Sequence, residues 1–336
     1  MDFSVIIPTY NRGARILGTL DSLRHQSVQP SQFEVVVVDD GSTDDTFAQV
    51  SGFLEANELS TWRCLRLKEN RGKTAALNTG SLAASGTILA FTDDDIIPCE
   101  KWVAAHQGQH ESAGQSIGVV GPVKYPDEWI QQSNLVHYHN STYLGQPGNR
   151  MTRLILAGKP LPPSHWAGGN SSLPRQVLLE VGLFDETLRR AVDGELAIRL
   201  VRYGLELCYE PQALVTHRPD YAMSYQQWIT QFGKNYQGGV EVVTARYPEE
   251  SARYGHWFLG TPSWGKEPLG RSIAKTLCRL SAQPAFGRLV FKLLERLDKN
   301  PKFYHPMAYK YVLACVALRA MKTRRDKGAG KSVGQS

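Results

Sequence analysis

Two clusters of acidic residues, each directly after an apolar run, are the part of this chain best suited to chemistry. The first is VVVVDDGSTDD at residues 35–45, and the second is FTDDDI at residues 91–96. Apolar runs of this kind are typical of buried strands, so the acids fall where strands end. Ligands of open α/β sheets bind beyond the carboxyl ends of the strands, and we therefore expect both clusters to face one crevice.

Carboxylates gathered in one crevice repel one another unless a cation lies between them. Those concerned are Asp39, Asp40 and the triplet Asp93, Asp94 and Asp95. A divalent metal is the simplest source of positive charge, because Mg²⁺ and Mn²⁺ bind a few carboxylates together with the oxygens of a diphosphate. The acid clusters thus predict a metal-assisted site for a phosphorylated substrate.

The segments around these clusters alternate between strand-like and helix-like patterns four times. Short apolar runs predict the strands, and apolar residues spaced three to four apart predict the helices. Such alternation favours a mostly parallel sheet with helices on both faces. The predicted strands are residues 5–9, 35–38, 64–67 and 88–91, and the predicted helices between them are residues 16–23, 47–54 and 74–84.

The composition is that of a folded protein without a zinc centre. With 336 residues, of which 42% are hydrophobic, the chain can bury a full core. Its five cysteines are odd in number and lack the paired spacing of zinc ligands, so we expect reduced thiols. Residues 1–8 enter a strand-like run without a basic, apolar leader, from which we expect a cytoplasmic protein.

Charge is distributed unevenly along the chain. Residues 266–336 hold 16 Lys and Arg against 4 Asp and Glu, whereas residues 1–265 hold 22 against 28. In the basic part, residues 286–297 show an amphipathic helical pattern, and residues 309–321 form an apolar stretch too short to span a bilayer, which takes about 20 residues. Two interpretations stay open: these helices pack as ordinary core, or they bind an anionic membrane surface. We expect no nucleic-acid partner, because interleaved aromatic residues and a known binding motif are missing.

Six short motifs, in this order along the chain, resemble those of the family 2 glycosyltransferases. They are IIPTYNR at 6–12, VVDDGSTDDT at 37–46, ENRGKTAALNTG at 69–80, TDDDIIP at 92–98, GGNSS at 168–172 and FDE at 184–186. The resemblance implies a nucleotide-sugar donor carrying UDP, GDP or dTDP, a Mn²⁺ or Mg²⁺ ion, and inversion at the anomeric carbon. It implies a single-domain α/β fold of the GT-A type, with a Rossmann-like, mostly parallel sheet.

The same resemblance sets the predicted domain boundaries. The catalytic domain would cover residues 1–222, with a nucleotide-sugar half at about 1–98 and an acceptor half at about 99–222. Residues 223–336, which the resemblance does not cover, would form a helical, basic C-terminal extension.

In the donor site that the resemblance implies, an aromatic ring and a carboxylate hold the nucleotide. Tyr10 would stack on the base, and Asp40 would accept hydrogen bonds from the base or the ribose. Pro8 belongs to the same first motif. Arg71 would approach the diphosphate or the base, since a guanidinium suits phosphate geometry.

The acid triplet contains the D-x-D spacing of the family's metal site. In an extended segment Asp93 and Asp95 point to one side and Asp94 to the other. Asp95 would bind the metal directly, and Asp93 would contact the metal or the ribose. Asp94 stays an alternative donor contact, and His217 matches a position where relatives supply a further metal ligand.

The catalytic base is expected on the acceptor side, in AVDGELAIRL at residues 191–200. The family carries a Glu-Asp pair there, of which this chain keeps the acid Asp193 but has Val192 in place of the Glu. Asp193 would take the proton of the acceptor hydroxyl. The resemblance places Glu195 beside it, and Gly169 and Asn170 of the GGNSS motif in an acceptor-side loop.

The sequence therefore predicts a metal-dependent, inverting glycosyltransferase for a hexosyl or related sugar. Its acceptor would be a lipid-linked or growing saccharide, and the enzyme would lie peripherally on the inner face of a membrane. Two alternatives remain: a degenerate, non-catalytic scaffold, which Val192 favours, and a transferase acting on a soluble small molecule. A nucleotidyltransferase would carry a Gly-rich phosphate loop after the first strand, and IIPTYNRGAR is not one.

Overall fold

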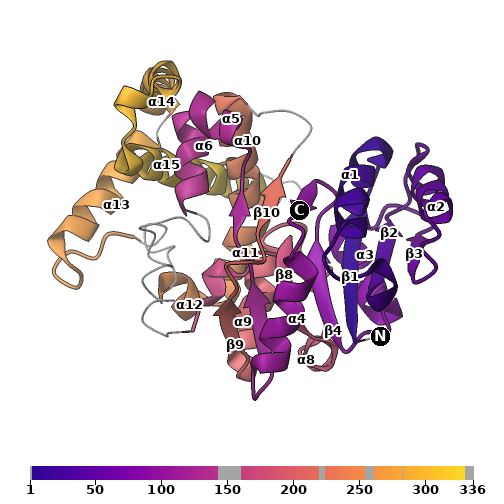
Figure 1. Ribbon diagram of the computed structural model, residues 1–336. Coiled ribbons are helices and arrows are strands. Elements are labelled where there is room, and N and C mark those ends of the chain that lie inside the picture. Colours follow the sequence, from indigo (N-terminus) through magenta and orange to yellow (C-terminus); the bar gives the residue numbers. More distant parts are fainter. Residues whose placement is uncertain (1, 143–159, 219–223, 254–260, 283, 330–336) are drawn as a thin grey trace, which may run out of the picture. The chain divides into compact units, whose positions relative to one another are not determined.

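The computed structural model describes residues 2–142, 160–218, 224–253, 261–282 and 284–329 (Figure 1). The chain divides into two compact units. The sheet unit consists of residues 1–126 and 140–221, and the helical unit consists of residues 127–139 and 222–336.

A seven-stranded sheet forms the centre of the sheet unit (Figure 1). Its strand order is β3-β2-β1-β4-β8-β6-β9. The four strands predicted from the sequence are confirmed and pair in parallel, whereas β8 runs antiparallel to both of its neighbours. The strands are β1 (Phe3–Thr9), β2 (Glu34–Asp39), β3 (Trp62–Arg66), β4 (Ile88–Thr92), β6 (Ile117–Val120), β8 (Asn170–Pro174) and β9 (Glu206–Tyr209).

Helices cover both faces of this sheet, as the alternation of patterns predicted. Successive side chains of a strand point to opposite faces. Accordingly, Val5 and Ile7 of β1 pack with residues of α1, α2 and α4, while Ile6 packs with residues of α3, α8 and α9. The helices are α1 (Gly13–Arg24), α2 (Thr46–Ala56), α3 (Lys73–Ala83), α4 (Trp102–Ser112), α8 (Arg175–Glu180) and α9 (Val192–Tyr203).

A second, three-stranded sheet brings a late segment of the chain to the acid triplet. Its order is β5-β10-β7, formed by β5 (Ile96–Pro98), β10 (Val215–His217) and β7 (Val123–Lys124). β10 is antiparallel to β5, so that His217 lies opposite Ile96. The N–H of Arg218 also donates to the carbonyl oxygen of Asp95 at 2.8 Å. These bonds place His217 beside Asp95.

The helical unit contains the amphipathic and apolar segments predicted near the C-terminus. The apolar stretch lies in α15, where Val312, Cys315 and Ala317 are buried. No helix among the described residues combines the length and the apolar character that a membrane span requires. The elements are α5 (Asp127–Gln132), α6 (Asn134–Thr142), α10 (Tyr225–Asn235), a π-helical turn (Tyr236–Val240), α11 (Glu241–Arg246), α12 (Pro248–Arg253), α13 (Leu269–Ser281), α14 (Pro284–Asp298) and α15 (Pro306–Ala329).

Residues 127–139, which we had assigned to the acceptor half, pack with the helical unit instead. The buried carboxylate of Asp298 in α14 accepts hydrogen bonds from the hydroxyl of Ser133 at 2.7 Å and the N–H of Leu135 at 2.8 Å. The rings of His137 and Tyr304 stack with centroids 4.3 Å apart. These contacts join segments far apart in sequence, which is why local patterns did not reveal them.

Close packing of α3 on the sheet gives a test of this architecture. A Cβ atom on Gly80 would lie 2.6 Å from Ile6 Cγ2 and 3.1 Å from Val38 Cγ2. Overpacking a core typically costs about 1–3 kcal/mol, so we expect Gly80→Ala to lower the free energy of unfolding by that amount. Gly52→Ala in α2 is the matched control, because its Cβ would meet no atom within 4 Å. The control should raise stability by up to about 1 kcal/mol through helix propensity. Urea unfolding would measure both, and equal effects would contradict the packing.

Candidate active site

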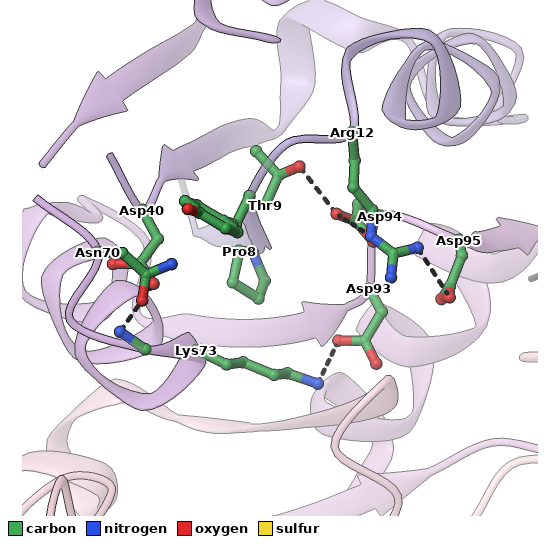
Figure 2. A pocket seen from close by; sticks show the side chains of 11 residues that line it. Pro8, Thr9, Arg12, Asp40, Asn70, Lys73, Asp93, Asp94 and Asp95 are labelled. Carbon is green, nitrogen blue, oxygen red and sulfur yellow. Dashed lines mark hydrogen bonds and ion pairs between the residues drawn. The ribbon is translucent and has the colours of Figure 1, made fainter. Parts of the chain in front are cut away.

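A pocket of about 380 Å³ opens where β1, β2 and β4 end (Figure 2). A volume of this size is typical of small-ligand sites. The predicted residues Pro8, Tyr10, Asp40 and the acid triplet come together there, so the shared crevice is confirmed for these acids but not for Asp39. The lining consists of Pro8, Thr9, Tyr10, Arg12, Asp40, Asn70, Gly72, Lys73, Asp93, Asp94 and Asp95.

The two acids of the first cluster have different surroundings. The carboxylate of Asp40 accepts hydrogen bonds from the backbone N–H groups of Arg71 at 2.8 Å and Gly72 at 2.7 Å. It thereby fixes the loop before α3 while lining the pocket. Asp39 is fully buried and accepts from the N–H of Ser42 at 2.9 Å, so it braces the turn after β2.

Tyr10 and Arg71 differ in how they present their side chains. The ring of Tyr10 lines the pocket and is 39% exposed, so one of its faces is open to a ligand. The guanidinium of Arg71 instead pairs with the carboxylate of Glu186 at 3.0 Å. The backbone N–H of Arg71 therefore binds Asp40 of the pocket, whereas its side chain binds Glu186 of the FDE motif.

The acid triplet forms a turn, not the extended segment that we predicted. β4 ends just before it, and the N–H of Ile96 donates back to the carbonyl oxygen of Asp93 at 3.2 Å. The alternation of an extended strand does not apply to a turn, so all three carboxylates line the pocket. Asp93 pairs with the ammonium of Lys73 at 2.6 Å, and Asp94 accepts a hydrogen bond from Thr9 at 2.8 Å (Figure 2).

Basic side chains of the protein itself offset much of the carboxylate charge. Arg12 and Arg15 approach Asp95 with nitrogen to oxygen distances of 3.8 and 3.9 Å, and Lys73 pairs with Asp93. The expectation that a metal is the simplest relief of the repulsion therefore needs correction. The chain supplies three cations of its own, and a metal would add to them.

Burial and neighbouring charges shift the pKa values of the pocket. Burial raises the pKa of Asp94 to about 7, against the opposing hydrogen bond from Thr9. Burial also acts on Asp95, but the hydrogen bond and charge of His217 outweigh it and lower the Asp95 pKa. Burial likewise disfavours charge on Lys73, yet the carboxylates around it raise its pKa above the usual value. At neutral pH the pocket therefore holds an ionised Asp95 and a charged Lys73.

Asp95 and His217 form the pair that fits a divalent cation. Asp95 Oδ1 and His217 Nε2 are 3.3 Å apart. Neighbouring ligands held about 2.1 Å from one metal ion are separated by about 3 Å, so this spacing suits two adjacent coordination positions. Carboxylate and imidazole are both ligands of first-row metals such as Mn²⁺. Among the described residues, no set of three His, Cys, Asp or Glu side chains converges on one metal position. Ligand oxygens and water would have to complete the shell.

Asp193, in the first turn of α9, faces Gly168, the first glycine of the GGNSS motif. A Cβ atom on Gly168 would lie 2.1 Å from Asp193 Oδ1, and one on Gly169 would lie 3.1 Å from Asp93 Oδ2. The absent side chains thus let two carboxylates approach the same short backbone segment. Burial raises the pKa of Asp193, although the charge of Lys73 opposes the shift. A raised pKa suits a carboxylate that has to accept a proton.

Asn170 is the centre of a buried hydrogen-bond network and does not face the pocket. Its Oδ1 accepts from Trp102 Nε1 at 2.7 Å and from His106 Nε2 at 3.1 Å, and its Nδ2 donates to two main-chain carbonyl oxygens at 2.8 Å. The network continues through Ser172, whose hydroxyl bonds His106 Nδ1 and His110 Nε2, each at 2.8 Å. The amide is fully used, which places Asn170 away from the acceptor role that we predicted.

Glu195 is buried one turn into α9. Both of its carboxylate oxygens accept hydrogen bonds from the guanidinium of Arg199, at distances between 2.7 and 3.1 Å. Arg199 in turn donates to the carbonyl oxygen of Val181 at 2.6 Å. Glu195 therefore anchors the helix that carries Asp193, instead of lying on the acceptor side as predicted.

Two basic residues of the pocket, Lys73 and Arg12, had no predicted role. Both lie inside motifs that carried the family resemblance. A signal for Lys73 was available, because Gly72 precedes the apolar pattern of α3 and marks the helix start. A lysine at the first helical position would then face the ends of the strands. Arg12 had no such signal, since its contact with Asp95 depends on the turn of the triplet.

Comparison with known proteins connects this site to a family. The model of Glycosyl transferase family 2 matches residues 4–176. The uncharacterized glycosyltransferase YfnE of Bacillus subtilis is 28% identical over 249 residues, which cover 61% of this chain and 62% of that protein. The pre-mycofactocin glycosyltransferase of Mycobacterium tuberculosis is 29% identical over 257 residues, covering 75% of this chain and 49% of that protein. This chain thus spans about half to three fifths of the length of these curated relatives.

A solved structure shows the same fold. The mannosyltransferase PcManGT of Pyrobaculum calidifontis, in complex with GDP-Man and Mn²⁺, aligns with a TM-score of 0.61. The alignment covers 95% of this chain and 87% of that one at 21% identity. At this identity the likeness concerns the fold, and it supports the predicted GT-A type.

The buried histidines predict a pH-dependent stability. Burial lowers the pKa of His106 to about 3 and that of His110 to about 4, so both are neutral in the folded chain at neutral pH. Below a pH of about 6.5 the unfolded chain binds the protons first. The free energy of unfolding should then fall by up to about 1.4 kcal/mol per pH unit for each histidine as the pH drops toward 4.

Urea unfolding between pH 7 and pH 4.5 would measure this slope. His110→Gln should flatten it, whereas His25→Gln, at the exposed end of α1, is the matched control and should not. An unchanged slope in His110→Gln would contradict the assignment.

Proposed function

The chain belongs to glycosyl transferase family 2, and from this we propose that it transfers a sugar from a nucleotide-diphosphate donor to a hydroxyl group, with inversion. One observation carries the proposal. A single pocket gathers an open aromatic ring, a carboxylate at the end of β2 and an acid triplet with a lysine. Asp193, a candidate base, approaches the same glycine pair as Asp93.

The donor nucleotide would bind between the first two motifs. Tyr10 would stack on the base, and Asp40 would accept hydrogen bonds from the base or ribose. Although Asp40 already bonds two backbone N–H groups, a carboxylate has about four acceptor positions, so two remain. Pro8 would border this subsite. Arg71 would have to leave Glu186 to reach the diphosphate.

The leaving diphosphate would lie beside Lys73 and the acid triplet. Asp95 and His217 would hold a Mn²⁺ or Mg²⁺ ion, with Asp93 or Asp94 nearby. When bound, such an ion neutralises charge that develops on the leaving group. The ammonium of Lys73 is held in place by Asp93 and can orient the phosphate oxygens from the other side.

Asp193 would act as the general base of a single displacement. The acceptor hydroxyl would attack the anomeric carbon, the bond to the diphosphate would break, and Asp193 would take up the hydroxyl proton. Burial raises the pKa of Asp193, which makes its carboxylate a stronger base. Gly168 and Gly169 would border the acceptor, because their missing side chains let the carboxylates of Asp193 and Asp93 approach this segment.

The acceptor that we propose is a lipid-linked or growing saccharide, with the enzyme held peripherally at the inner face of a membrane. The basic helices near the C-terminus support this, because they would keep the enzyme where such acceptors lie. A soluble acceptor is the alternative if membrane binding fails. A degenerate scaffold is disfavoured, since the acid triplet, Lys73 and Asp193 are all present in one unit.

Nucleotide binding should depend on the metal and on Asp95. We expect one of UDP, GDP or dTDP to bind in calorimetric titrations with Mn²⁺, and Asp95→Ala to weaken that binding at least tenfold by removing a metal ligand. Asp21→Ala, which changes an exposed acid of α1, is the matched control and should bind like the wild type. Binding that survives in Asp95→Ala, or in the wild type with a chelator, would contradict the metal site. Absence of binding by all three would favour the scaffold.

The glycine pair gives a separate test of the base. An alanine at 168 would push against Asp193, so we expect Gly168→Ala to lower kcat at least 100-fold while leaving donor affinity within a few-fold. Gly194→Ala is the control, because its Cβ would meet no atom within 4 Å. Release of nucleoside diphosphate from the donor would be followed for both, and for Asp193→Asn, which should resemble Gly168→Ala. A Gly168→Ala enzyme with normal kcat would exclude Asp193 as the base in this geometry.

A further inference from the structure

One surface of the helical unit exposes apolar side chains that the proposed chemistry does not use. In α13 the exposed residues are Leu269, Ile273, Leu277 and Leu280, with between 43% and 66% of their surface open. At about 100° per residue these four side chains lie within about 80° of the helix circumference. They form one apolar row along α13.

The opposite side of α13 is buried against the rest of its unit. Ser272, Lys275 and Cys278 are buried, and Cys278 belongs to a small cluster with Ala314 and Cys315 of α15. Lys275 is held by Glu267 at 2.6 Å. Because α13 packs on α15 through its other side, which carries Cys278, the exposed row is not the face that holds this helix in its unit.

The neighbouring helix α14 pairs its own exposed apolar side chains with basic ones. Leu289 and Leu293 are 68% and 56% exposed. At about 100° per residue, the side of the helix directly next to them carries four basic residues. These exposed residues are Arg288, Lys292, Arg296 and Lys299.

Acidic residues are few along α13 and α14. Across residues 269–299 there are seven Lys and Arg, of which Lys275 is buried, and two acids. Of the acids, Asp298 is buried, and Glu295 accepts a hydrogen bond from Gln226 at 2.9 Å. Trp264, just before α13, is 57% exposed, and an aromatic of this type suits the boundary between headgroups and acyl chains.

We propose that the exposed rows of α13 and α14 are the surface by which this chain lies on an anionic phospholipid bilayer. An apolar row flanked by basic side chains is what an in-plane interfacial helix requires. A second copy of the chain would fit less well, because two such surfaces would bring like charges together. Anionic headgroups supply the opposite charge, and the acyl boundary covers the leucines. The inference rests on the peripheral attachment proposed above, but not on sugar transfer.

Vesicle co-sedimentation of the full chain tests this surface. The wild type should bind vesicles of phosphatidylcholine with phosphatidylglycerol, bind phosphatidylcholine alone at least tenfold more weakly, and lose affinity as salt rises. The double variant Leu277→Asp with Leu280→Asp should reduce binding to anionic vesicles at least tenfold. Leu82→Asp is the matched control, since Leu82 of α3 is 54% exposed in the sheet unit. It should bind like the wild type.

A charge variant separates the two components of binding. Arg288→Glu with Lys292→Glu should weaken binding to anionic vesicles and remove most of its salt dependence. Vesicle binding by the leucine variant at wild-type strength would overturn the surface while leaving peripheral attachment standing. Failure of the wild type to bind would overturn both.

Light scattering gives a further outcome against the proposal. If the wild type is a dimer that the leucine variant separates, the surface joins two copies instead. Nucleotide titration of the same variants measures donor binding in the sheet unit. A failure of the proposed transfer function would therefore be distinguished from a failure of membrane binding.

Discussion

The concentration of negative charge at the ends of three parallel strands is the constraint on which the rest of the site depends. Asp40, the acid triplet and Asp193 are all partly or fully withdrawn from water, where an unpaired carboxylate is costly. The fold meets this with Lys73, Arg12 and Arg15, and with backbone N–H groups at Asp40. The carboxylates can therefore stay close together before any ligand arrives, so the pocket is preorganised by ion pairs and not by apolar packing.

A buried network of neutral hydrogen bonds lies next to the segment that carries the two glycines. Asn170 at the start of β8 connects α4 to main-chain carbonyls elsewhere in the unit, and both histidines of its network are kept uncharged by burial. Gly168 and Gly169 directly precede β8. The network therefore anchors the chain next to the backbone that Asp93 and Asp193 approach.

Much of the sheet unit could be predicted from sequence, and the exceptions have physical causes. Continuous apolar runs and helical spacing were enough to find β1 to β4 and the helices between them, since each pattern is local. The direction of the Asp94 side chain depends on the turn between Asp93 and Ile96, and the sequence of the triplet alone does not predict that turn. Asn170 was misplaced because its partner Trp102 is far away in the sequence, so no local pattern reveals the contact. Glu195 was misplaced although its partner Arg199 lies one helical turn further along α9, a spacing at which acidic and basic side chains pair. Residues 127–139 and Asp298 are also far apart in the sequence, so no local pattern predicts their contact.

His217 reaches Asp95 only because β10 is paired with β5 in one particular register, with His217 opposite Ile96. Side chains alternate along a strand, so a slip of one residue would turn the imidazole to the other face of this small sheet. The length of the connection before β10 is thus part of the site, because it sets this register. Among natural or engineered variants of this chain, a single-residue insertion or deletion that shifts the register of β10 would separate His217 from Asp95.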